Sequence, residues 1–430
     1  MPRAIYINTD GGEVITISFI RDKIFYGWVI VASGLLIFTI GLGIRYSFGV
    51  FLKTIESEFG LTRGGTSGIF SLYMLLCCIF AVAGGWILDR YGPKIVVVCM
   101  GFFTGLSFFL SSQATAAWQL FITYGVLFAL GTGALFTVIN STTSRWFEKK
   151  RGLALGITTS GTGVGTIVMA PLATFLITTF SWRTAFIVIG IIAWFIITLM
   201  GLVLKKDPRN IGLLPDGVKR GAVRSRPNDH LVFPAGLSLL QSLQTGDFWF
   251  LNLAWLFLSL NVHLFIVHVV PYATDMGIAP MDAALIVSLA GGATIAGRLG
   301  IGAISDATGR KIPAIACAFL QTGSLLWLLW AGELWVFYTI AVVFGLLWGG
   351  LSTMIMALIG DVFGLRSIGV IMGVMSAGWS LGAAAGPAIG GFIFDMSGYY
   401  STAFVIGAGA MFITTFLVSL VNVKKHQLQS

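Results

Sequence analysis

Twelve apolar stretches, each about 18 residues or longer, follow one another along this chain of 430 residues. Such runs are long enough to cross the hydrocarbon core of a bilayer as helices, and they are too long and too uniformly apolar for barrel strands. Only 10% of the residues are charged, against about 25% in soluble domains. We therefore predict an all-α integral membrane protein, with the lipid bilayer among its partners.

The predicted spans form two sets of six. The first set covers residues 26–52, 64–88, 95–113, 118–144, 152–178 and 184–204, and the second covers 247–274, 281–304, 312–331, 334–360, 367–394 and 401–423. The end of the polar segment between the sets, LSLLQSLQTGDFWF, indicates a short interfacial helix. The predicted organisation begins with a cytoplasmic N-terminal segment (1–25) and an N-terminal six-helix bundle (26–204). A cytoplasmic linker (205–246), a C-terminal six-helix bundle (247–423) and a cytoplasmic tail (424–430) follow.

The distribution of lysine and arginine predicts the orientation. The termini and the loops that follow even-numbered spans carry 21 of the 26 basic residues, and the opposite side carries Lys53, Arg63 and Arg183. Cytoplasmic loops hold the excess of basic residues in membrane proteins, so both termini are predicted to be cytoplasmic in a plasma or bacterial inner membrane. The net charge of +9 mostly reflects this bias, and we predict no nucleic-acid partner.

The two sets of spans resemble each other in sequence. Gly85-Trp-Ile-Leu-Asp89-Arg-Tyr-Gly92-Pro-Lys94 recurs 217 residues later as Gly302-Ala-Ile-Ser-Asp306-Ala-Thr-Gly309-Arg-Lys311. A Gly-rich segment ending at Pro171 recurs 216 residues later, ending at Pro387. This repetition predicts two pseudo-symmetric six-helix bundles with a binding site between them near the membrane midplane, and rocking of the bundles then gives alternating access.

The repeated G-x-x-x-D-R-x-G-x-K/R pattern resembles the major facilitator superfamily over the whole chain. In that family this turn gates the cytoplasmic side, and the glycines suit its tight backbone. The resemblance therefore implies gating roles rather than ligand roles for the residues of both copies, namely Asp89, Arg90, Gly92, Lys94, Asp306, Gly309, Arg310 and Lys311.

A narrower resemblance concerns the monocarboxylate transporters and the related oxalate/formate antiporters. It rests on the segment from Arg145 to Ile157, on Tyr46-Ser-Phe-Gly-Val-Phe51, on Trp348-Gly-Gly with Asp361-Val-Phe-Gly364, and on Gly297-Arg298-Leu299. In both families the arginine matching Arg298 binds the substrate carboxylate.

Two positions depart from those families. Monocarboxylate/proton symporters have an aspartate one turn before the arginine, where this chain has Thr294. Oxalate exchangers have a lysine in span eleven, and residues 368–381 contain none. Protons and a counter-anion therefore both remain candidate coupled partners.

Arg298 is the principal candidate for substrate binding. It lies eight residues before Asp306, about 12 Å along a helix and so near the midplane. An arginine in a span costs roughly 2.5–3.5 kcal/mol to insert, and its planar fork suits a carboxylate. Arg45, in the outer half of span one, either supplies a second substrate cation or extends to the outer interface.

Further candidates for the substrate site are polar or aromatic residues within spans. His263 lies 217 residues after Tyr46 and is its pseudo-equivalent. His263 and His268 each bind substrate, carry a proton or are satisfied by a neighbouring helix. Asn140 and Tyr124 either line the cavity or serve packing, and the same alternatives apply to Trp348 and Trp379.

Enzyme, metal and cofactor roles lack their sequence signatures. No HExxH, GxSxG or paired intramembrane carboxylate occurs, and the four cysteines lie in apolar runs without a metal-ligand spacing. The resemblance, together with the arginines within the spans, predicts a secondary active or facilitative transporter of small organic anions, such as lactate, pyruvate or formate, with the carboxylate bound by Arg298. The alternatives are a drug or other small-molecule exporter, a sugar carrier, a dicarboxylate exchanger or a sensor of the same superfamily.

Overall fold

The computed structural model describes residues 5–8, 14–17, 25–147, 150–211, 213, 215–217, 236–364 and 368–422. The side chains of Asp306 and Ala307 are outside this description. Within the described residues, twelve helices are long and apolar enough to cross a membrane. Together with the family match reported below, they confirm the predicted fold class.

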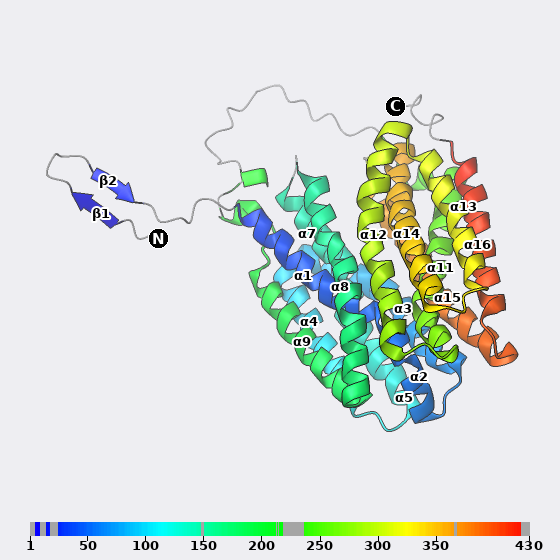
Figure 1. Ribbon diagram of the computed structural model, residues 1–430. Helices are drawn as coiled ribbons and strands as arrows, with labels where there is room; N and C mark the ends of the chain where they lie inside the picture. The colour runs from blue at the N-terminus through cyan, green and yellow to red at the C-terminus, as the bar shows by residue number, and fades with distance from the viewer. Residues whose placement is uncertain are drawn as a thin grey trace.

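The first six spans form one group of helices, the N-terminal half (Figure 1). They are α1 (Tyr26–Tyr46), α3 (Arg63–Tyr91), α4 (Pro93–Ser112), a composite span (Ala117–Trp146), α8 (Arg151–Thr179) and α9 (Trp182–Val203). The composite span consists of α5 (Ala117–Leu120), the π-helical η1 (Phe121–Leu127), α6 (Phe128–Thr132) and α7 (Leu135–Trp146).

The last six spans form the C-terminal half. They are α11 (Gly246–Asp275), α12 (Pro280–Thr308), α13 (Lys311–Leu328), α14 (Leu334–Phe363), α15 (Ile368–Ser397) and α16 (Ser401–Leu420). The predicted span boundaries differ from these mostly by a few residues. Several of the longer helices extend past the predicted span, because their last turn is polar and exposed and hydropathy does not count it. Asp89–Tyr91 of α3 is an example.

The first span is shorter than predicted. α1 ends at Tyr46, and a separate helix, α2 (Phe48–Phe59), follows it, whereas the sequence predicted a continuous span to residue 52. The Ser47 hydroxyl donates to the carbonyl of Gly43 at 2.7 Å, one turn back. Serine bonds of this kind compete with the helix ladder and often bend helices, which accounts for a break that hydropathy does not register.

Smaller elements lie outside the spans. A two-stranded antiparallel hairpin, β1 (Ile5–Asn8) with β2 (Val14–Ile17), precedes α1 and was not predicted. The 3-10 turns η2 (Pro208–Ile211) and η3 (Pro215–Gly217) follow α9. The expected interfacial helix is limited to α10 (Leu239–Leu243), which Ser238 and Gln241 cap reciprocally.

Three helix pairs hold the two halves together: α8 with α12, α3 with α15, and α2 with α11. Glycines allow the closest approaches. A Cβ at Gly163 of α8 would lie 2.6 Å from the carbonyl oxygen of Gly291 on α12, and one at Gly391 of α15 would lie 2.7 Å from the carbonyl of Arg63. Small residues that let backbones approach are characteristic of helix packing in membranes.

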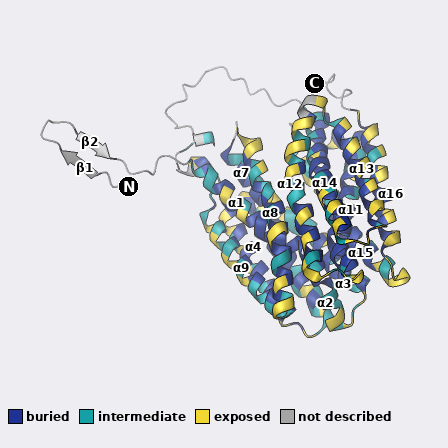
Figure 2. Ribbon diagram, viewed as in Figure 1, coloured by how far each residue is buried: buried dark blue, intermediate teal, exposed yellow. Residues whose placement is uncertain are grey.

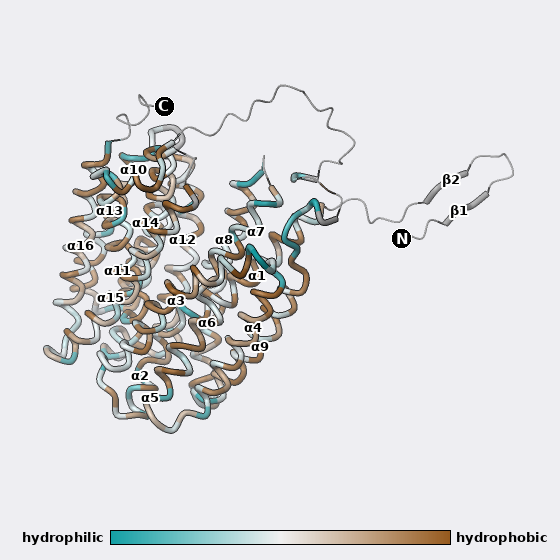
Figure 3. Tube along the Cα trace, turned by 180° about the vertical axis from the view of Figure 1, so that it is seen from behind, coloured by the Kyte–Doolittle hydropathy of each residue, from teal (hydrophilic) through white to brown (hydrophobic). Residues whose placement is uncertain are grey.

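The perimeter of the bundle is apolar. Large side chains such as Val82, Phe195 and Trp330 are exposed there, and Figure 2 shows exposed residues along the outer faces of the helices. Figure 3 shows hydrophobic residues along the length of the spans and hydrophilic ones mainly near their ends. We call the end that carries α2 and α5 the α2 end, and the end that carries α10 the linker end (Figures 1 and 3).

Candidate functional site

Arg298 lies on α12 at the contact between the two halves. Its side chain is half-buried, and Nη1 donates to the carbonyl of Thr159 on α8 at 3.1 Å. Among the described residues, no carboxylate forms an ion pair with Arg298. In the described part of the chain, the Thr159 carbonyl is the hydrogen-bond partner of this guanidinium, a planar group whose geometry suits a carboxylate.

Tyr46, the last residue of α1 in the N-terminal half, lies near Arg298 and near two aromatic residues of the C-terminal half. Its hydroxyl lies within electrostatic range of both Arg298 and Arg45. Its ring centroid lies 5.6 Å from that of Trp348 on α14 and 5.8 Å from that of His263 on α11. The pseudo-equivalent pair Tyr46 and His263 therefore meet at the interface, where the duplication predicted a shared site.

Trp379 completes this cluster from α15. Its ring centroid lies 5.8 Å from that of His263, and its carbonyl accepts a 2.6 Å hydrogen bond from the hydroxyl of Ser259. Four predicted residues, Tyr46, His263, Trp348 and Trp379, are thus brought together. We call these four the aromatic cluster.

Arg45 points into the N-terminal half. Only 4% of it is exposed, Nε donates to the Tyr73 hydroxyl at 2.7 Å, and Nη2 approaches the Cys77 sulfur at 3.9 Å. The Tyr73 hydroxyl also bonds to that of Thr132 at 2.7 Å. The interpretation of Arg45 as a residue that reaches the outer interface is therefore wrong, because α1 directs its side chain toward α3.

His263 has one satisfied ring nitrogen. Nδ1 lies 2.8 Å from the carbonyl oxygen of Ser259, one turn earlier on α11, and Nε2 is buried without a hydrogen-bond partner in the structure. His263 itself is fully buried. A buried polar atom left unpaired is rare enough to require an explanation.

The remaining candidates lie elsewhere. Both nitrogens of His268 are paired, Nε2 with the carbonyl of Pro387 at 2.9 Å and Nδ1 with the Tyr400 hydroxyl at 3.2 Å. Tyr124 is buried among aromatic rings of the N-terminal half, as its packing interpretation implied. Asn140 is half-buried on α7 with an unpaired Oδ1. None of the three has a ring contact or hydrogen bond with the aromatic cluster among the described contacts.

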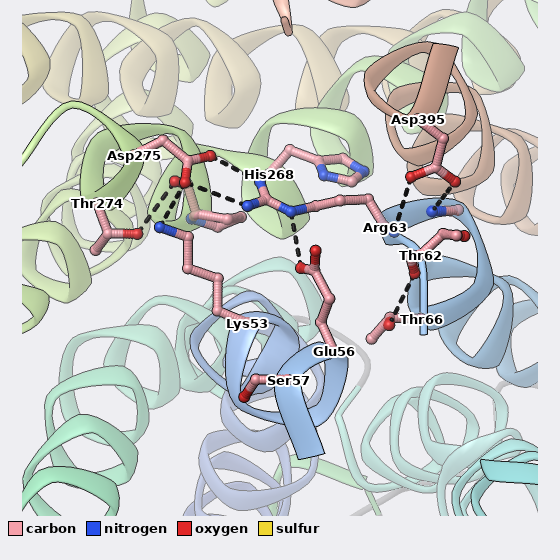
Figure 4. A network of polar contacts seen from close by, with 12 residues as sticks. Lys53, Glu56, Ser57, Thr62, Arg63, Thr66, His268, Thr274, Asp275 and Asp395 are labelled. Atoms are coloured by element: carbon pink, nitrogen blue, oxygen red, sulfur yellow. Dashed lines mark hydrogen bonds and ion pairs between the residues drawn. The ribbon is translucent and has the colours of Figure 1, made fainter. Parts of the chain in front are cut away.

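A charged network at the α2 end was not predicted (Figure 4). Arg63, the first residue of α3, donates from Nε to Glu56 of α2 at 2.8 Å and from Nη1 to Asp275 of α11 at 2.8 Å. Lys53 of α2 pairs with the same Asp275 at 2.6 Å. The network therefore joins the N-terminal half to the C-terminal half through side-chain charges.

The same network includes a backbone contact. Asp395 of α15 accepts from the backbone N–H groups of Arg63 and Gly64, each at 2.9 Å, so a carboxylate of one half caps a helix N-terminus of the other (Figure 4). The Arg63 guanidinium also donates to the Tyr400 hydroxyl at 2.6 Å and lies 4.1 Å from the Phe394 ring centroid. Arg63 thus contacts α11, α15 and Tyr400, the residue that precedes α16, all in the C-terminal half.

The repeated motif lies at the linker end. Gly92 and Gly309 have φ of 84° and 81°, as the predicted tight turns require. Asp89 pairs with Arg145 of α7 at 2.8 Å, and Arg310 pairs with Asp361 of α14 at 2.6 Å. The first pair is between helices of the N-terminal half and the second between elements of the C-terminal half.

The other motif residues make weaker contacts. Arg90 lies 5.7 Å from the Trp86 ring, the Lys311 ammonium donates to the carbonyl of Val421 at 2.8 Å, and Lys94 is exposed. The side chain of Asp306 lies outside the described residues. The gating roles remain predictions, because no ion pair of these residues in the described part of the chain connects the two halves.

Metal binding has no support in the described residues, which contain no group of three or more His, Cys, Asp or Glu side chains suited to an ion.

Comparison with known proteins covers most of the chain. The sequence profile of the Major Facilitator Superfamily matches residues 31–375 and 257–429. Monocarboxylate transporter 13 of Bos taurus is 25% identical over 90% of this chain and 87% of its own length. Monocarboxylate transporter 12 of Xenopus laevis is 26% identical over 93% and 89% of the two chains, respectively.

Among solved structures, a bacterial homologue of the human lysosomal transporter Spinster, in an inward-facing and unoccupied conformation, covers 92% of this chain and 95% of its own. It superposes with a TM-score of 0.69 at 15% identity, a likeness that concerns the fold.

Proposed function

Because this chain belongs to the Major Facilitator Superfamily, resembles the monocarboxylate transporters and is therefore a membrane transporter, we propose that it carries small organic anions. The proposed substrates are monocarboxylates such as lactate, pyruvate or formate, with the carboxylate bound by Arg298. The observation that carries this proposal is the half-buried guanidinium at the contact between the halves, paired with a backbone carbonyl and with no described acid.

The energetics of a buried cation support this choice of ligand. An arginine within a span costs roughly 2.5–3.5 kcal/mol, and no carboxylate among the described side chains pairs with Arg298 to offset that cost. A substrate carboxylate can accept two parallel N–H bonds from the fork, and charged hydrogen bonds contribute ~1.5–3 kcal/mol each. A cationic drug would meet Arg298 and Arg45 as repulsive charges, which disfavours a drug exporter for cations.

Transport proceeds in this proposal by rocking of the two halves around the site. Arg298 and Tyr46 belong to different halves, so a ligand held between them contacts both. The Arg63 network closes the α2 end in the conformation of the structure. We assign the linker end to the cytoplasm, following the lysine and arginine distribution, and the chain to the plasma or inner membrane.

Coupling is proposed to be anion exchange or uniport rather than proton symport. His268 has both ring nitrogens engaged, and Thr294 replaces the aspartate of the proton-coupled relatives. Pyranine trapped in liposomes reports protons that enter with substrate. Stoichiometric acidification that disappears in His263→Gln or His268→Gln would overturn this part of the proposal and identify the proton carrier.

The substrate class is tested with purified protein in proteoliposomes. We expect uptake and thermal stabilisation with monocarboxylates, and neither with the corresponding amides. Arg298→Ala should lower uptake at least about a hundredfold, since two charged hydrogen bonds are lost. Arg298→Lys should transport poorly, because the ammonium keeps the charge without the planar fork.

The matched control is Arg209→Ala, which removes an exposed arginine of η2 and should leave uptake unchanged. Near-normal carboxylate kinetics in Arg298→Ala would show that Arg298 is structural and would refute the proposal.

A further inference from the structure

The ring nitrogen Nε2 of His263 has no hydrogen-bond partner in the structure, and its protonation decides which substrate groups it can bind. The protonation of the ring follows from its partner: the carbonyl oxygen of Ser259 can only accept a hydrogen bond, and it lies 2.8 Å from Nδ1. Nδ1 therefore carries a proton. If the ring is neutral, Nε2 is then a lone-pair acceptor and not a donor.

The surroundings favour the neutral ring. His263 is fully buried, and the rings nearest to it are those of Tyr46 on α1, Phe70 on α3 and Trp379 on α15. None of these is acidic, and the charge that acts on His263 is the guanidinium of Arg45. An imidazolium here would have no counter-charge, so Nε2 is a buried acceptor without a donor.

The position of this acceptor relates it to the proposed carboxylate site. The ring centroid of His263 lies 5.8 Å from that of Tyr46, and the Tyr46 hydroxyl interacts electrostatically with Arg298. A guanidinium that binds a carboxylate and an acceptor that needs a donor thus lie around the same tyrosine. A carboxylate oxygen cannot satisfy Nε2, since both atoms offer lone pairs, whereas a hydroxyl can.

We propose that His263 makes the transporter selective for hydroxy monocarboxylates, by accepting a hydrogen bond from the substrate hydroxyl while Arg298 binds the carboxylate. This inference rests on the proposed function of Arg298. A site built to bond a hydroxyl rejects the analogue that lacks it, because the polar group of the site is then left unpaired. Oxo and unsubstituted acids of the same size are therefore poorer substrates.

The halves must separate locally for this contact to form. Tyr46 and Phe70 belong to the N-terminal half, and His263 and Trp379 to the C-terminal half, so the rings that cover Nε2 come from both sides of the interface. Rocking of the halves changes this cover. The hydrogen bond from the substrate hydroxyl to Nε2 then forms in the substrate-bound conformation and not in the conformation of the structure. A substrate that carries this donor therefore favours the substrate-bound conformation.

The experiment compares substrates that differ only in the donor. L-lactate is compared with pyruvate and propionate, and 3-hydroxybutyrate with butyrate, as competitors and as transported substrates in proteoliposomes. His263→Asn keeps an N–H able to bond the Ser259 carbonyl but removes the acceptor. His263→Gln keeps an acceptor near the position of Nε2, and it is the matched control.

We expect wild-type protein to prefer at least one hydroxy acid over its unsubstituted partner. His263→Asn should lower the ratio of hydroxy-acid uptake to uptake of its unsubstituted partner about three- to tenfold, the effect of one neutral hydrogen bond. His263→Gln should retain more of the preference. Equal losses for both acids in His263→Asn, or no preference in wild-type protein, would overturn the inference.

These outcomes separate the inference from the proposed function. Transport of propionate that depends on Arg298 but shows no hydroxyl preference refutes only the role of His263. Carboxylate transport that survives Arg298→Ala refutes both. If His263→Asn fails to fold, as judged by thermal unfolding, the absence of a hydroxyl preference in the wild-type protein still overturns the inference.

Discussion

The two ends of the bundle use charge differently. At the α2 end, Arg63 and Lys53 of one half bind Asp275 of the other. At the linker end, the described pairs Asp89–Arg145 and Arg310–Asp361 each stay within one half. Charges at the α2 end therefore oppose separation of the halves, whereas the linker-end pairs fix helices inside a half and can persist while the halves move.

The largest expected effect follows from removing the centre of the α2-end network. Arg63→Gln loses the bonds to Glu56 and Asp275 and leaves Asp275 with Lys53 alone, which should cost the closed conformation about 2–3 kcal/mol. The population open at the α2 end should rise by roughly thirty- to one hundred and fiftyfold. Spin labels at Ser57 and Met276, in a background without the native cysteines, report the distance across this end.

An unchanged distance distribution in Arg63→Gln would show that apolar packing, and not charge, closes the α2 end.

A smaller effect is expected from the helix cap across the interface. Asp395→Asn removes the negative charge at the N-terminus of α3 but keeps one acceptor for the N–H groups of Arg63 and Gly64. A charge near a helix N-terminus contributes about 0.3–1 kcal/mol when exposed, so the shift toward the open state should be a few-fold. The same labelled pair measures it, and a shift as large as that of Arg63→Gln would contradict the ranking.

The linker end should respond differently. Asp89→Asn breaks the pair with Arg145, and because Asp89 is 73% exposed, the loss of stability should be about 0–1 kcal/mol. We expect a small decrease in unfolding temperature and no change in the Ser57–Met276 distance. Opening of the α2 end by this variant would mean that the linker-end pair acts between the halves after all.

The smallest effect is expected for an ion pair that lies at the α2 end without connecting the two halves. Glu58 of α2 pairs with Arg183 of α9 at 2.6 Å, at the α2 end but within one half. The hydrogen bond from Arg183 holds the pKa of Glu58 below its usual value, so this pair stabilises the fold above the ordinary carboxyl range and is lost as the pH falls through the lowered pKa. Glu58→Gln should weaken that acid dependence without opening the α2 end, as the labelled pair would report.

Hydropathy and internal repetition were sufficient to predict the twelve spans. The same repetition related Tyr46 to His263, and the structure places their rings 5.8 Å apart. Arg298 could be selected because a lone charge within a span is costly. In each case a local property of the sequence, its apolarity, its repetition or its charge, carries the relevant physics.

The α2-end network could not be predicted in this way. Arg63 lies 212 residues from Asp275 and 332 from Asp395, and each is one more charge at the end of a span until the helices are packed. The direction of Arg45 was ambiguous for a related reason, because helical periodicity gives the angle between neighbours and not the face that meets α3. The break at Ser47 had a weak signal, a serine whose hydroxyl can bond the preceding turn.

The short helix α2 connects the two regions. Lys53 lies seven positions after Tyr46, so the ion pair with Asp275 and the aromatic cluster share one stretch of chain interrupted only at Ser47. A ligand that shifts the protein toward separation at the α2 end binds more tightly to protein in which that separation has already occurred. The factor by which the ligand shifts the equilibrium equals the factor by which separation raises its affinity. The strength of the Lys53–Asp275 contact thus sets, through this reciprocity, part of the apparent affinity for a molecule it never touches.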